Sequence, residues 1–220
     1  VPPNTGDFIV QTIIKRTLEN EAIKREKLTY KRVYAVDNLN DREQITDRER
    51  EEVVLIEPGG KEKIVQINGR QVNGGKAKAP KFDLIKVLEA MAKLDNFEVA
   101  RIEMIAARPN YVIHFKAKPR QRTNGDVEEI LVRSEGVIHV DIEKFYIKQF
   151  SAWIVRSYAR GGIFGWNIFN LTRANIEMAQ EEFNGIVVMS SVLITDRYSL
   201  FGADTFEKQT WTYQDYQLAK

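Results

Sequence analysis

Residues 171–198 read LTRANIEMAQEEFNGIVVMSSVLITDRY, and this stretch decides the fold that we expect for the whole chain. The pair Asn184-Gly185 divides it into two runs in which apolar residues alternate with polar ones. An Asn-Gly pair between alternating runs is the strongest short-range signal for a tight β-hairpin. The sequence therefore predicts two long antiparallel strands, over residues 171–183 and 186–198.

The same alternation recurs through most of the chain, and turn residues separate the runs. The other expected strands are 28–36, a hairpin over 43–68 that turns at EPGG, 96–106 and 111–118 joined at Arg108-Pro109-Asn110, 136–141, 145–158 and 204–217. About ten strands joined by short turns predict an antiparallel sheet.

Two segments have helical periodicity instead. The first covers residues 6–26, with its stripe at Val10, Ile13, Ile14, Leu18 and Ala22. The second covers residues 81–95, with its stripe at Leu84, Leu88 and Met91. Residues 127–133 fit a short helix or a strand equally well.

Apolar residues occupy both faces of two expected strands. In 145–158 one face has Tyr146, Phe150, Ala152, Ile154 and Tyr158, and the other has Ile147, Trp153 and Val155. In 186–198 the two sets are Ile186, Val188, Val192 and Ile194, and Val187, Met189 and Leu193. A sheet with one wet face alternates more cleanly. We therefore expect an α+β fold, with a single antiparallel, strongly curved sheet (an incomplete β-barrel) and helices packed on its concave side.

Composition narrows the function. The 220 residues include no cysteine, which excludes disulfides, thiolate metal sites and a cysteine nucleophile and suits an oxidising compartment. The 33 basic and 31 acidic residues argue against a dedicated nucleic-acid binder. We expect residues 1–5 to be a disordered or trimmed N-terminus, and residues 6–220 to form one domain.

No strong catalytic motif is present. His114 and His139 lie in separate expected strands, where ordinary sheet positions explain them better than a shared metal site. The stretch GRQVNGGK (69–76) has the wrong glycine spacing for a phosphate-binding loop. We expect no enzyme activity, no catalytic residue, no metal and no cofactor.

An apolar, glycine-rich stretch, ARGGIFGWNIFN, covers residues 159–170. It connects two expected strands, and Phe164 and Trp166 either plug one end of the barrel or project from it as a docking tip. With the two-sided strands, this stretch gives a candidate ligand-binding set. Its members are Phe150, Trp153, Val155, Phe164, Trp166, Met189 and Leu193.

The order of these elements, with GVIHVD (136–141), IEKF (142–145) and TWTYQDYQ (210–217), resembles a known superfamily. It is similar to the LolA/LolB-like periplasmic outer-membrane lipoprotein-sorting proteins, and most similar to their larger branch, from Gly6 to Gln217. The resemblance implies a cavity that takes lipoprotein acyl chains. It also implies an arginine that holds the helical lid closed, for which Arg101 and Arg156 are candidates.

These observations favour a non-enzymatic periplasmic binding protein for an acyl chain, lipid or lipoprotein, exported with its signal peptide removed. Its partners would be the apolar ligand and a membrane surface or protein, without nucleic acid. The alternative is a protein-interaction or envelope-sensor domain on the same scaffold, with a cavity filled by its own side chains.

Overall fold

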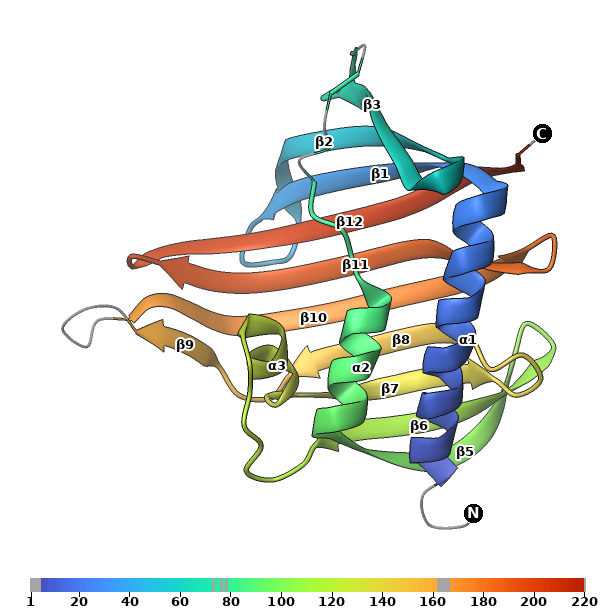
Figure 1. Ribbon diagram of the computed structural model, residues 1–220. Helices are drawn as coiled ribbons and strands as arrows, with labels where there is room; N and C mark the ends of the chain where they lie inside the picture. The colour runs from blue at the N-terminus through green and yellow to red at the C-terminus, as the bar shows by residue number, and fades with distance from the viewer. Residues whose placement is uncertain (1–4, 73, 76, 78, 162–166, 220) are drawn as a thin grey trace.

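One antiparallel sheet forms most of the molecule (Figure 1). The computed structural model describes residues 5–72, 74–75, 77, 79–161 and 167–219. The strand order is β4-β3-β2-β1-β12-β11-β10-β8-β7-β6-β5, and β9 pairs with β10 beside this path. The strands are β1 (Leu28–Leu39), β2 (Ile45–Glu57), β3 (Lys61–Ile67), β4 (Arg70–Gln71), β5 (Asp95–Ile105), β6 (Arg108–Ala117), β7 (Ser134–Asp141), β8 (Ile147–Ile154), β9 (Tyr158–Gly161), β10 (Asn167–Phe183), β11 (Ile186–Leu200) and β12 (Ala203–Leu218).

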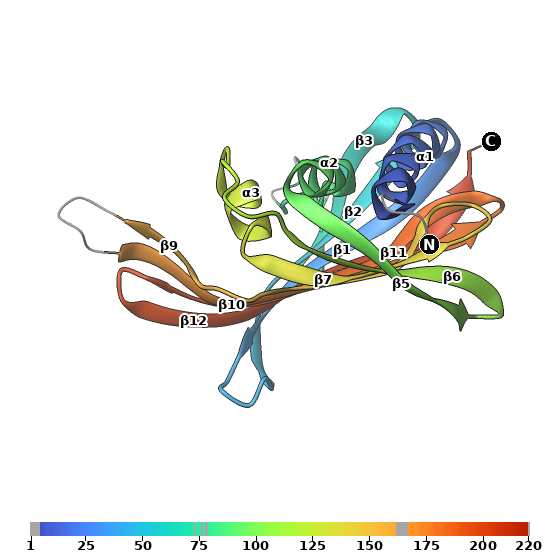
Figure 2. The same ribbon diagram turned by 90° about the horizontal axis from the view of Figure 1, so that it is seen from below.

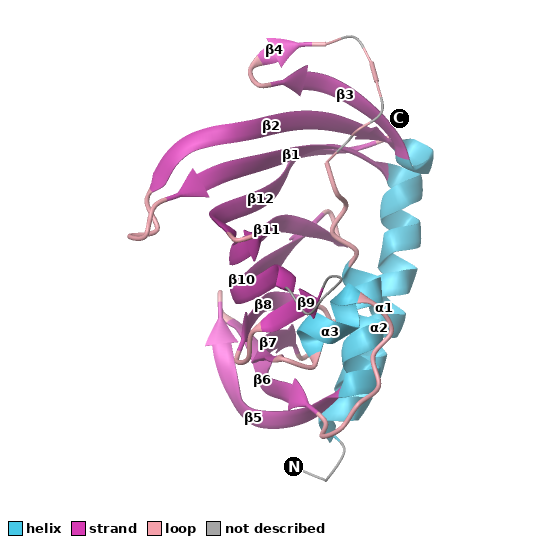
Figure 3. Ribbon diagram, turned by 90° about the vertical axis from the view of Figure 1, so that its left-hand side faces the viewer, coloured by secondary structure: helices cyan, strands magenta, loops and turns pink. Residues whose placement is uncertain are grey.

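Among the described residues, three α-helices lie on the concave side of this sheet, which curves around them without closing (Figure 3). They are α1 (Thr5–Lys27), α2 (Leu84–Leu94) and α3 (Asp126–Leu131). Asp83 caps α2, because its side chain accepts a hydrogen bond of 3.0 Å from the backbone N–H of Lys86. The predicted fold class is confirmed.

The main hydrophobic core lies between α1, α2 and the middle strands. From α2, Leu88, Met91 and Leu94 are fully buried, and α1 adds Ile9 and Ile13. The predicted stripe of α1 is right only in its first half, because Leu18 and Ala22 are exposed.

For β8 and β11, the predicted division of side chains between the two faces is wrong, because a β-bulge shifts the alternation in each strand. Register shifts occur where β8 meets β7 and where β11 meets β10. As a result Ile147 lies in the same core cluster as Phe150, and Met189 lies in it with Val192. Some apolar residues that were predicted to lie on opposite faces therefore lie together on the face that the helices cover.

The Asn184-Gly185 hairpin is confirmed as the turn between β10 and β11, with φ values of 49° and 78°. The turn predicted at 108–110 is wrong. Ala106 and Ala107, with φ values of 47° and 62°, form it instead, and Pro109 lies within β6 opposite Met104.

Three other predictions are corrected or extended. The strand expected over 145–158 is two strands, β8 and β9, and the ambiguous segment 127–133 contains α3. The expected N-terminal tail falls mostly outside the described residues, and Thr5 already belongs to α1. No helix among the described residues is long and apolar enough to cross a membrane.

Candidate functional site

A cleft of about 560 Å³ lies between the C-terminal half of α1, the residues that lead into α2, and strands β1, β3 and β12. Figure 1 shows this end of α1 beside β3 and β1. The apolar members of its lining are Ala22, Leu28, Tyr30, Ile56, Phe82, Leu84, Ile85, Met189 and Tyr213. The charged members are Glu21, Lys24, Arg25, Arg32, Glu62, Lys81 and Asp83.

Several apolar residues of the lining are buried in the fold. Leu28, Ile56 and Met189 are buried, and Met189 and Leu84 also belong to the main core. Phe82 packs against the same core from the segment before α2. The cleft is therefore continuous with the core and opens toward charged residues.

A buried ion pair stands beside these apolar residues. Arg32 is 5% exposed, and its Nη1 and Nη2 atoms lie 3.3 and 3.5 Å from the two carboxylate oxygens of Glu62. Lys81 reaches the same carboxylate at 3.0 Å. The Arg32 Nε atom has no hydrogen-bond partner among the described residues. A buried charge needs such pairing, and Glu62 of β3 supplies it to Arg32 of β1 from across the intervening strand β2.

Two tyrosines of the lining, Tyr30 and Tyr213, belong to a cluster of three with Tyr216, which lies outside the lining. The Tyr30 ring stacks on Tyr216 with centroids 5.0 Å apart and lies 6.3 Å from Tyr213. Lys24, which pairs with Glu21, places its amine 5.8 Å from the Tyr30 ring centre. Burial raises the pKa of Tyr213 to about 12 and raises the pKa of Tyr30 above its ordinary value. These phenols stay neutral in the physiological range, so they act as hydrogen-bonding groups on an apolar body.

The structure separates the residues of the predicted ligand-binding set. Met189 lines the cleft, and Phe150 lies in the adjoining core, stacked on Phe115 at 5.6 Å. Trp153 is 39% exposed, and its indole N–H donates to Glu135 at 3.2 Å.

The remaining members of the set also lie apart from the cleft. Val155 is exposed between β8 and β9, and Leu193 is partly buried in β11, opposite Glu177 and Thr210. Phe164 and Trp166 lie outside the described residues.

Sequence reasoning missed the charged part of the cleft. Arg32 interrupts an apolar run, LTYKRVYAV, just as the candidates Arg101 and Arg156 interrupt theirs. Arg101 is instead exposed and pairs with Glu103, and Arg156 is exposed and donates to the Val132 carbonyl. The apolar run around Arg32 could have indicated this residue from the sequence. Its partner Glu62, however, comes from another strand.

A carboxylate pair lies elsewhere in the sheet. Asp196 of β11 pairs in register with Glu207 of β12, and burial followed by the Glu207 charge raises the pKa of Asp196 to about 7. Glu207 accepts from Gln209 at 2.6 Å and from the Tyr198 hydroxyl at 3.3 Å. Neither residue lines the cleft described above, and two carboxylates at facing positions repel each other, which favours the protonated form of Asp196.

The two histidines do not form a metal centre with their neighbours. His139 pairs with Val112 and His114 with Val137, which makes the two imidazoles diagonal neighbours on β7 and β6. Burial lowers the pKa of His139. Within the part of the chain that the structure describes, no group of three or more His, Cys, Asp or Glu residues is arranged to hold a metal ion.

The fold is an open antiparallel sheet that curves around helices, with a cleft beside one helix. No protein-family model matches the sequence, and no curated protein matches it. Solved structures do. A LolA superfamily protein from Nitrosomonas europaea shows 12% identity over 96% of this chain and 94% of that chain, with a TM-score of 0.37.

Two further solved structures are similar. A putative outer membrane lipoprotein-sorting protein domain from Vibrio parahaemolyticus has 6% identity, coverage of 95% and 93%, and a TM-score of 0.36. MucB in complex with MucA(peri) has 9% identity, coverage of 96% and 99%, and a TM-score of 0.28.

Proposed function

We propose that this chain binds an amphipathic ligand with an acyl-chain-like apolar part in the cleft beside α1. The observation that carries the proposal is the cleft itself, whose buried apolar lining is continuous with the core and whose other lining residues are charged. Its volume of about 560 Å³ lies within the range of small-molecule sites, which is about 300–1,000 Å³.

The lining divides the ligand into two parts. An apolar chain would lie against Leu28, Ile56 and Met189, where each Å² removed from water contributes about 25 cal/mol before ordering costs. A polar end would stay near the hydroxyls of Tyr30 and Tyr213. Binding of this kind needs no covalent step, so we propose a binding protein rather than an enzyme.

The way that α1 is held supports its role as the wall of the cleft. Its first half is anchored by buried apolar residues, including Ile9, Val10 and Ile13. Its second half is held by polar contacts to β11 and to the turn Pro58–Gly60 between β2 and β3. Asn20 bonds the backbone N–H and carbonyl of Val187, and Arg25 donates to the Gly59 carbonyl at 3.0 Å. Polar contacts of this kind exchange with water more readily than a packed core does.

Ala22 gives a direct test, because it is an exposed residue of α1 that lines the cleft. We expect Ala22→Trp to fill the cleft and weaken binding of a fluorescent fatty acid by about tenfold or more. Leu18→Trp is the matched control, because Leu18 is exposed on the same helix and does not line the cleft. Wild-type protein that binds no probe, or an Ala22→Trp variant that binds like wild type, would contradict the proposal.

One observation favours a second candidate, a protein-interaction domain. Leu88, Met91 and Leu94 fill the centre of the concave face with the chain's own side chains. If no lipid co-purifies with the wild-type protein in mass spectrometry and no fatty-acid probe binds, this second function is the better one. The periplasmic location expected from the resemblance belongs to both proposals, and cell fractionation tests it.

A further inference from the structure

The two edges of the sheet differ in length. At one edge β4 has two residues, Arg70 and Gln71, whereas at the other edge β5 has 11 residues and pairs only with β6. Long unpaired edges offer a row of backbone groups for another strand, and proteins usually shorten or cover them. β5 is therefore the edge whose exposure needs an explanation.

Helix α1 covers only the first part of β5. Gly6 packs so closely that a Cβ atom there would lie 2.5 Å from the carbonyl oxygen of Phe97. Residues 100–104 are all exposed, and they include Ile102 at 62% and Met104 at 63%. Figure 2 shows this end of the β5–β6 hairpin projecting beyond the helices. The exposed part thus carries apolar side chains as well as a free backbone edge.

The turn fixes which backbone groups are free. Ala106 and Ala107 form a two-residue turn, so the flanking pair Ile105–Arg108 is hydrogen-bonded, and bonded pairs recur at every second residue. Glu103 is the next hydrogen-bonded position in this pattern, so its N–H and C=O groups point toward β6. Ile102 and Met104 lie at the intervening positions, so their N–H and C=O groups point away from β6.

We propose that β5 pairs antiparallel with β5 of a second copy of this chain, about a two-fold axis at Ile102. The sequence around that residue is self-complementary. Ile102 would face Ile102 of the partner subunit across a hydrogen-bonded pair. Met104 would face the small Ala100 of the partner subunit, the residue at which β5 bulges against β6 and regular pairing would end. This register covers the two exposed apolar side chains and joins the two sheets edge to edge.

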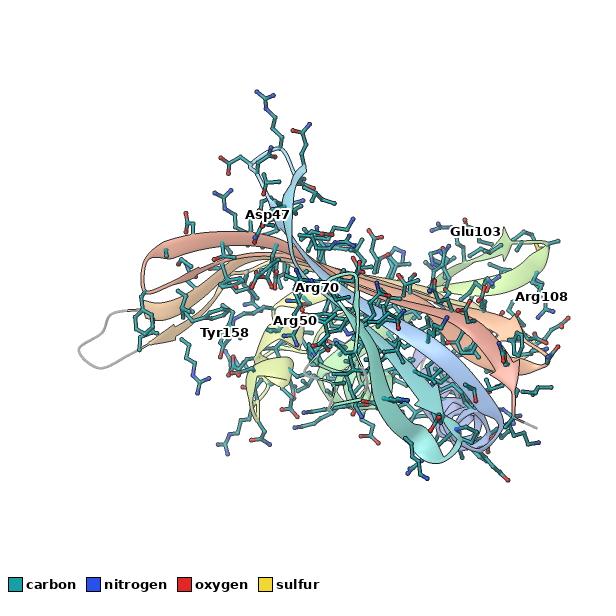
Figure 4. The ribbon with its side chains drawn as sticks, turned by 90° about the horizontal axis from the view of Figure 1, so that it is seen from above. Asp47, Arg50, Arg70, Glu103, Arg108 and Tyr158 are labelled. Carbon is teal, nitrogen blue, oxygen red and sulfur yellow. The ribbon has the colours of Figure 1, made fainter. Side chains whose placement is uncertain are left out.

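Charge complementarity supports the same register. Arg101 and Glu103 flank Ile102 and pair with each other at 2.9 Å, and both are exposed. In the two-fold arrangement each Arg101 lies directly opposite a Glu103 of the other copy, so four charges alternate in sign. Figure 4 shows Glu103 near the end of the hairpin that lies away from the helices, where another chain can reach it. Opposite charges at facing positions stabilise antiparallel strand pairs, and like charges oppose them.

Charge reversal and charge exchange test the proposal, with sedimentation velocity over a concentration series as the readout. We expect wild-type protein to form a dimer in the micromolar range. Arg101→Glu would place like charges opposite each other and weaken the dimer by about tenfold or more. The exchange variant Arg101→Glu/Glu103→Arg restores alternation and should restore the dimer.

Ile102→Pro is a second test. Proline lacks the backbone N–H that Ile102 offers at the free edge of β5, and proline is tolerated at an edge strand. We expect a monomer whose melting temperature matches that of monomeric Arg101→Glu. Phe201→Ser is the control for non-specific association, since Phe201 is 78% exposed in the β11–β12 turn, away from β5. A wild-type protein that stays monomeric at all concentrations overturns the proposal, as does a dimer that Arg101→Glu leaves unchanged. Neither result bears on fatty-acid binding in the α1 cleft.

Discussion

Helices α1 and α2 cover the same concave face with different chemistry. α2 seals its part of the sheet with buried leucines and a methionine, whereas the second half of α1 meets the sheet through Asn20, Lys24 and Arg25. The α2 side is a packed core, and the α1 side has a cleft. The difference shows that one sheet can be packed tightly in one region and leave a cleft in another.

The largest effect should come from the packed side. Leu88→Ala removes a fully buried side chain between α2 and the sheet and leaves a cavity, so we expect a loss of about 3 kcal/mol in the free energy of unfolding. Ile85→Ala is the matched change on the same helix. Because Ile85 lines the cleft and is only partly buried, its cost should be about 1 kcal/mol or less. Urea unfolding measures both, and equal losses would remove the distinction between the two regions.

A second effect comes from a buried acid at the end of α2. Asp95 is fully buried, and neither of its carboxylate oxygens has a hydrogen-bond partner among the described residues. Burial raises the pKa of Asp95 to about 7, and Lys118 opposes this shift. In the unfolded chain the group ionises near pH 4, so folding stability is lost as the pH rises from about 4 through 7.

Asp95→Asn removes that loss. We expect the variant to match wild type in stability below about pH 4, where both side chains are neutral, and to be increasingly more stable than wild type as the pH rises to 8. Urea unfolding over a pH series measures the difference. Asp204→Asn, at an exposed carboxylate, should follow wild type throughout. If the Asp95→Asn difference does not grow with pH, the buried acid carries no penalty.

The packed side was also the more predictable one from sequence. Leu84, Leu88 and Met91 follow helical spacing, and the Asn184-Gly185 turn sets its own hairpin, because each depends on neighbours in the chain. The turn at Ala106-Ala107 gives no such signal, since alanine does not favour positive φ.

The cleft was hidden for a related reason. A bulge in β11 moves Met189 to the helix side, and alternation alone cannot place a bulge. Arg32 and Glu62 lie on β1 and β3 and meet across the intervening strand β2, so their burial depends on tertiary structure. Local pattern therefore predicted the core and the fold class, and it missed the charged side of the site.

The smallest effect should come from the ion pair of the cleft, and removing its two members should have different costs in stability. Glu62→Gln leaves the Arg32 guanidinium, whose side chain is 6% exposed, without its carboxylate, so we expect a cost of about 1–2 kcal/mol. Arg32→Met leaves Glu62 partly exposed and still paired with Lys81, and should cost less than about 1 kcal/mol. Urea unfolding at neutral pH compares them. If Arg32→Met is the more costly change, Arg32 contributes packing against Tyr30 and Tyr213 beyond its charge, and the α1 side is closer to a packed core than its cleft indicates.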